Sequence, residues 1–128
     1  MLVSETPLKN RLEEVPDYCG AVSVSSHSIR ILNGFRTNYT STDQALNQLR
    51  RLRLYFRDDN PCFLDYLQIR GKTGVFEYTE TLRQVDSAFD SAKEELIERK
   101  PGRGIDRVIE FAKDLSEVCS SQTKSIRV

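Results

Sequence analysis

The fold expected from this sequence depends on one stretch, Ala21-Val-Ser-Val-Ser-Ser-His-Ser-Ile-Arg-Ile-Leu-Asn-Gly34. Residues 21–25 alternate apolar and small polar side chains, and residues 28–32 repeat the alternation, which is the period-2 pattern of half-buried strands. The pair Asn33-Gly34 is typical of a two-residue hairpin turn, because that turn needs positive φ at both central positions. The stretch therefore predicts strands, with residues 35–39 as the returning strand.

Three later segments carry helical patterns. Ser41 with Gln44, and Thr81 with Gln84, match the capping box that opens a helix. The first helix is expected to end near residue 56 and the second at Pro101-Gly102, and a third covers about residues 105–119. Apolar residues recur along them at spacings of three and four: Ala45, Leu49, Leu52 and Phe56; then Leu82, Val85, Phe89, Ala92 and Leu96; then Ile105, Val108, Ala112, Leu115 and Val118.

A second hairpin is predicted between the first two helices. Residues 62–69 are rich in aromatic and apolar side chains, residues 70–74 form a turn, and residues 75–78 are the partner strand. Hairpins interspersed with helices favour an α+β fold, a small antiparallel sheet of about four to five strands with about three helices packed on one face. We expect an N-terminal arm (1–17), a single α+β domain (18–119) and a polar C-terminal tail (120–128) that is disordered unless a partner holds it.

The composition argues against several classes of protein. The chain has 128 residues, and its 19 basic and 19 acidic side chains cancel, whereas proteins dedicated to nucleic acid or to membrane surfaces usually carry a basic excess. Cys19, Cys62 and Cys119 are scattered and odd in number, which indicates reduced thiols rather than a disulfide framework or a zinc site. We see no signal peptide and no membrane span, so we expect a cytoplasmic or nuclear protein that is not secreted.

The main candidate site is a row of arginines on the first predicted helix. Arg50, Arg53 and Arg57 recur at spacings of three and four, so they share a stripe beside the apolar face. Such a row could contact the phosphates or carboxylates of a partner. Alternatively, the long stems cover the flank of the core and pair with local acids. Arg30 and Arg36, on the predicted hairpin, would extend a basic surface for nucleic acid or an acidic partner.

Other features have ordinary structural explanations. Gly71-Lys72-Thr73 lacks the earlier glycine of a phosphate-binding loop, since Tyr66 stands at that position, and a hairpin turn accounts for it. His27 lies among serines but without a nucleophile elbow. Asp58-Asp59 is a weak candidate for acid–base work. Pro101-Gly102-Arg103-Gly104 could bind a phosphate at the start of the last helix, but an interhelical turn needs the same residues.

No catalytic constellation, cofactor motif or metal set remains, so we expect a non-enzymatic protein. The leading hypothesis is an interaction, assembly or accessory module that binds another protein or itself, as a homodimer. Ile109 and Phe111 widen the apolar face of the last helix, which indicates a self-association or partner surface, although a two-sided core contact inside the chain would also use them. The alternative is an RNA- or other nucleic-acid-binding protein that uses the arginine-rich helix face, with aromatic residues such as Tyr39 stacking on bases.

Overall fold

The computed structural model describes the backbone of residues 17–127 and the side chains of residues 17–122, and all its regular elements in that range are helices. They are α2 (Tyr18–Arg36), α3 (Thr42–Arg53), the 3-10 helix η1 (Leu54–Phe56), α4 (Pro61–Ile69), α5 (Val75–Glu98) and α6 (Gly104–Arg127). The predicted α+β fold with its antiparallel sheet is therefore wrong for this part of the chain. The predicted N-terminal arm lies outside the described residues except for Asp17.

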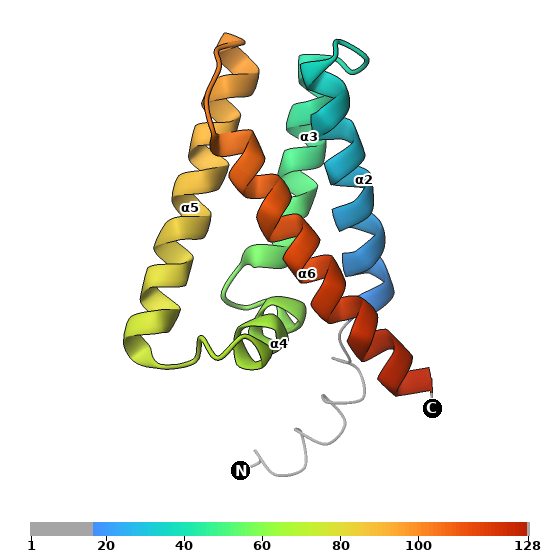
Figure 1. The fold of residues 1–128 in the computed structure, drawn as a ribbon, viewed down its shortest axis with the longest axis vertical. Coiled ribbons are helices and arrows are strands. Elements are labelled where there is room, and N and C mark those ends of the chain that lie inside the picture. Colours follow the sequence, from blue (N-terminus) through green and yellow to red (C-terminus); the bar gives the residue numbers. More distant parts are fainter. Residues whose placement is uncertain (1–16, 128) are drawn as a thin grey trace, which may run out of the picture.

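Four of the helices form an up-down-up-down bundle (Figure 1). α2 packs on α3, α3 packs on α5, and α6 closes the ring by contacting both α5 and α2, the latter most extensively. In Figure 1, α6 crosses in front of the other helices on a diagonal. The short helix α4 lies at one end of the bundle, against α6 and η1. The single core lies inside this ring.

The stretch that predicted strands is the greater part of α2. Its buried side chains are spaced as one helical face and are Ala21, Ser25, Ser28, Ile31, Leu32 and Phe35. Two of these core positions hold serine, so the buried face is not visible as an apolar stripe in the sequence. Small side chains at a helix contact let two helices approach closely. Asn33 and Gly34 lie within the last turn of this helix, which ends at Arg36, and the positive φ of 65° is found at Asn38 in the turn that follows.

One core hydroxyl on α2 provides a test of this packing. The Ser25 side chain is 0% exposed, and its oxygen has no hydrogen-bond partner among the described residues. Because an unsatisfied buried hydroxyl is costly, we expect Ser25→Ala to raise the free energy of unfolding by about 1 kcal/mol in urea denaturation. The matched control is Ser28→Ala. Its hydroxyl accepts from Gln48 Nε2 at 3.0 Å, so that variant should lose about 1–2 kcal/mol. Equal losses for both variants would contradict the prediction.

The predicted second hairpin is helical as well. Pro61 occupies the first turn of α4, and the Asn60 side chain caps the helix by accepting from the Cys62 amide at 2.8 Å. An Asn cap followed by proline indicates the start of a helix. The aromatic and apolar residues of the segment favoured a strand instead. Residues 75–78, the predicted partner strand, form the first turn of α5. Thr81, expected to cap that helix, instead donates to the Glu77 carbonyl oxygen from within it.

The three helices predicted from apolar spacing are confirmed. The Ser41 side chain accepts from the Gln44 amide at 3.2 Å at the start of α3. All the predicted stripe residues are buried except Leu82, which is partly buried. α6 is longer than expected and continues to Arg127. Residues 120–127, predicted as a polar tail, thus extend the last helix, and residue 128 lies outside the described residues.

The start of α6 is capped from inside the bundle. The Glu95 carboxylate on α5 is 5% exposed and accepts from the Gly104 amide at 2.6 Å and the Ile105 amide at 3.2 Å. It satisfies two of the amides that a helix N-terminus leaves without a partner. This carboxylate stands where a phosphate would have to bind. The residues from Pro101 to Gly104 are therefore an interhelical turn.

Candidate functional site

The three arginines predicted as a stripe line a groove between α3, η1 and α5. Arg50, Arg53 and Arg57 surround a hollow of about 560 Å³, together with Asp86 of α5. Arg50 and Arg53 also line an adjoining hollow of about 320 Å³, which contains Lys93. Because the two hollows share these two arginines, we treat them as one feature. We call it the arginine groove, defined by Arg50, Arg53, Arg57 and Lys93.

The arginines of this groove differ in how they are held. Arg53 donates to the Asp86 carboxylate at 2.7 Å, and its guanidinium lies 5.2 Å from the centre of the Phe89 ring. Arg57 lies 3.6 Å from Asp59, and Arg50 donates to the neutral amide oxygen of Asn47 at 2.9 Å. Exposed ion pairs of this kind contribute little energy. Arg53 is held on α5 by two contacts, the ion pair with Asp86 and the Phe89 ring, whereas Arg50 and Arg57 each have a single contact that a ligand can replace.

The groove combines this charge with apolar surface. The rings of Phe56 and Phe89 line it and are almost completely buried. Leu54, which is 53% exposed, and the partly buried Leu82 also line the first hollow. A ligand there would meet guanidinium groups and aliphatic side chains within one hollow. The sequence predicted the arginines but not the opposite wall, because nothing in it indicated that α5 lies beside α3.

The other predicted basic residues do not join this surface. Arg30 contacts the His27 Nδ1 atom at 2.7 Å on α2, and Arg36 pairs with Asp106 of α6 at 2.6 Å. Neither lines the arginine groove. Tyr39 is 87% exposed in the turn between α2 and α3 and does not line the groove either. The predicted set of five arginines is therefore divided between separate parts of the molecule.

The predicted self-association residues are packed within the chain. Ile109 is 6% exposed, and Phe111 is partly buried with its ring centre 6.0 Å from that of Phe56. The wide apolar face of α6 is explained by its position in the bundle, where it packs on α2, α5 and α4. The two-sided core contact is thus what the structure shows for this pair. A self-association role stays a prediction.

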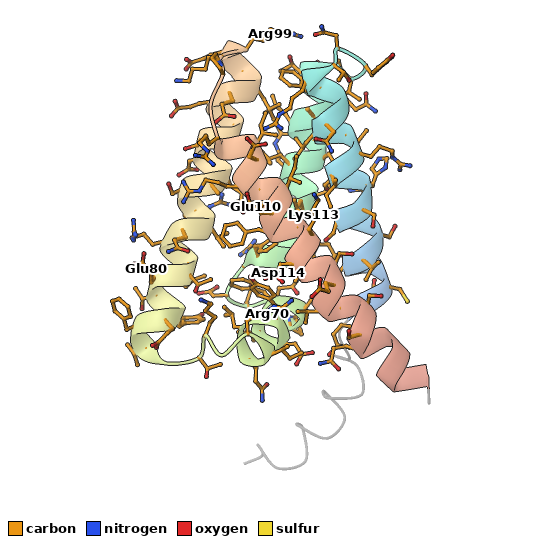
Figure 2. The ribbon with its side chains drawn as sticks, in the orientation of Figure 1. Arg70, Glu80, Arg99, Glu110, Lys113 and Asp114 are labelled. Atoms are coloured by element: carbon orange, nitrogen blue, oxygen red, sulfur yellow. The ribbon has the colours of Figure 1, made fainter. Side chains whose placement is uncertain are left out.

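A polar cluster that no sequence pattern predicted joins α4 to α6. Arg70, the C-cap residue of α4, contacts Asp114 of α6 (Figure 2). The same guanidinium donates to Glu117 at 3.0 Å. Burial is the main cause, and a hydrogen bond to Asp114 the second, of a Tyr66 pKa above its usual range. On the other side of α4, the Tyr18 hydroxyl donates to Asp65 at 2.7 Å. These contacts hold α4 on the bundle, and the polar groups that make them are already paired with one another.

The remaining candidates lead to no reactive arrangement. Asp58 lines the arginine groove and Asp59 pairs with Arg57, while His27 is engaged with Arg30. Gly71, with a φ of 70°, forms the turn after α4. Among the residues whose side chains are described, no group of three or more His, Cys, Asp or Glu could hold a metal ion. None of the described helices has both the length and the apolar character to cross a membrane.

Comparisons with protein-family models, with curated proteins and with solved structures find no match to this chain. A functional assignment therefore depends on the fold and on the chemistry of the arginine groove.

Proposed function

We propose that this protein is a non-enzymatic interaction module that binds an acidic segment of a protein partner in the arginine groove. The observation that supports this is the position of three arginines in one hollow that also has apolar walls. Arg50 and Arg57 would each bind a partner carboxylate, as planar guanidinium groups do well. An apolar side chain of the same segment would cover Leu54 and Leu82 and remove them from water.

A protein segment fits the groove better than a nucleic acid does. Base stacking needs exposed aromatic faces, but Phe56 and Phe89 are buried beneath the groove surface. The carboxylates of Asp58, Asp86 and Asp90 also line the two hollows and would repel a continuous phosphate backbone. A short peptide can place its carboxylates at the arginines and leave these acids in water. The alternative of an RNA-binding function is tested by the same experiment.

The test compares two probes and two variants. The probes are a fluorescent peptide library that alternates Asp or Glu with Leu or Phe, and a labelled single-stranded RNA, both followed by fluorescence anisotropy. Arg50→Glu/Arg57→Glu removes the two exchangeable arginines and leaves Arg53, which anchors the groove. We expect the double variant to bind its best peptide at least about tenfold more weakly, a loss of about 1.4 kcal/mol.

The matched control is Arg30→Glu/Arg51→Glu, which reverses two exposed charges outside the groove and should change binding less than about threefold. Equal binding by both double variants would exclude the groove. Binding of RNA in preference to every peptide, lost in the groove variant, would support the nucleic-acid function instead. If the acidic segment belongs to a second copy, light scattering should give a mass above 14.7 kDa that the groove variant lowers to the monomer.

A further inference from the structure

Two buried cysteines meet where α4 contacts α6. Cys62 is 2% exposed and Cys119 is 0% exposed, and their thiols share a hydrogen bond. The third cysteine, Cys19, is exposed on α2. The sequence predicted three scattered thiols, because Cys62 and Cys119 are far apart along the chain. Only the packing of α4 on α6 brings them together.

The contacts around the thiols fix the position of α4. At one end of this helix, Arg70 contacts Asp114 and Glu117 of α6. In the middle of this helix, Asp65 accepts a hydrogen bond from the Tyr18 hydroxyl of α2. These contacts oppose sliding or rotation of α4 on α6, so the two sulfur atoms remain in contact in the folded state. A disulfide requires close approach of two such residues with little backbone movement.

We propose that a peroxide converts Cys62 and Cys119 into a disulfide that ties α4 to α6. The Cys62 thiolate attacks one peroxide oxygen, the O–O bond breaks, and the departing hydroxide is protonated to water. The Cys119 sulfur then attacks the Cys62 sulfenic acid, the S–O bond breaks, and a second water leaves with the Cys119 proton. The two thiols together lose two electrons, and hydrogen peroxide gains them.

The order of attack follows from the contact between the thiols. The hydrogen bond to Cys119 lowers the pKa of Cys62, whereas the same contact, together with burial, raises the pKa of Cys119. The thiolate is the nucleophile, so Cys62 reacts first and Cys119 resolves the product. Because both sulfurs are buried, peroxide reaches Cys62 during a brief local opening of α4, and the disulfide forms when α4 returns to its contacts with α6. Helix α4 is the shortest of the described α-helices, and small peripheral units open most readily.

The test uses the full, reduced chain in native buffer with hydrogen peroxide. We expect a mass lower by two hydrogen atoms, a Cys62–Cys119 cross-linked peptide after non-reducing digestion, and a Tm higher by about 10 °C. Dithiothreitol should reverse all three changes. Cys19→Ser should behave as the unmodified chain does. Cys119→Ala removes the second sulfur and the hydrogen bond that lowers the pKa of Cys62, so this variant should form no intramolecular cross-link, react more slowly at Cys62 and show no rise in Tm.

Three results would overturn the proposal. One is oxidation of Cys19 alone while both buried thiols stay reduced. Another is a disulfide that forms in urea but not in native buffer, since it would show that the fold holds the sulfurs apart. The third is a native disulfide between these residues that lowers Tm, because strain would then exceed the gain from cross-linking.

Discussion

Replacing Gly104 with alanine is expected to lower the free energy of unfolding by about 3 kcal/mol or more. A Cβ atom at this position would overlap the backbone nitrogen of Ala92 and lie 2.6 Å from the carbonyl carbon of Ser91. Both atoms belong to the α5 backbone, which cannot rotate aside as a side chain can. The first turn of α6 would therefore have to move off α5. That movement would also draw the amides of Gly104 and Ile105 away from Glu95.

The control for this prediction is Gly74→Ala, at the N-cap of α5. A Cβ there would meet only the carboxylate of Glu77, an exposed side chain that can rotate, and we expect a loss below about 1 kcal/mol. Urea denaturation followed by far-UV circular dichroism gives both values. If the two variants unfold at the same urea concentration, the close approach of α6 to α5 does not limit the residue at position 104.

The elements that could be predicted from the sequence are those whose buried face is apolar. α3, α5 and α6 each carry a continuous stripe of Ala, Val, Leu, Ile or Phe at helical spacing, and the structure buries these stripes almost completely. α2 carries no such stripe, because serine occupies two of its core positions, 25 and 28. The partly buried Val22, Val24 and Ile29 then produce an alternation of apolar and polar residues that is typical of a strand. α4 is a short amphipathic segment. Asn60 followed by Pro61 indicates the start of a helix, but the aromatic and apolar residues that follow favour a strand.

Only one wall of the candidate site, the one that carries the arginines, could be predicted from the sequence. Local spacing placed Arg50, Arg53 and Arg57 on one face, since this depends on α3 and the residues directly after it. The opposite wall at Asp86 and Phe89 depends on which helix packs beside α3, and the spacing of residues along one helix carries no information on that. The same limit applies to Cys62 and Cys119. It also explains the error of grouping Arg30 and Arg36 with the other arginines, which depended on a hairpin that does not form.

Phe56→Ala is expected to lower the free energy of unfolding by about 3–5 kcal/mol. The Phe56 ring is 3% exposed, and its centre lies 5.6 Å from those of Phe63 and Phe89 and 6.0 Å from that of Phe111. These three partners come from α4, α5 and α6, so one side chain of η1 contacts three helices. Aromatic pairs at these separations add to the energy of burial alone. Alanine would leave a cavity where these helices meet.

The same ring also lines the arginine groove, so a substitution of Phe56 can change both the stability of the protein and the binding of the acidic peptide. Phe56→Leu keeps the apolar bulk and should cost only about 1–2 kcal/mol, so its groove should still bind the acidic peptide. Phe56→Ala should bind that peptide more weakly even at a temperature where circular dichroism shows it folded, because Leu54 and Arg57 flank the cavity in sequence and would lose their support. If the alanine variant is no less stable than the leucine variant, the aromatic cluster does not hold η1 in place. If it is less stable but binds the peptide equally well, the groove is positioned by Arg53, Asp86 and Phe89 without help from Phe56.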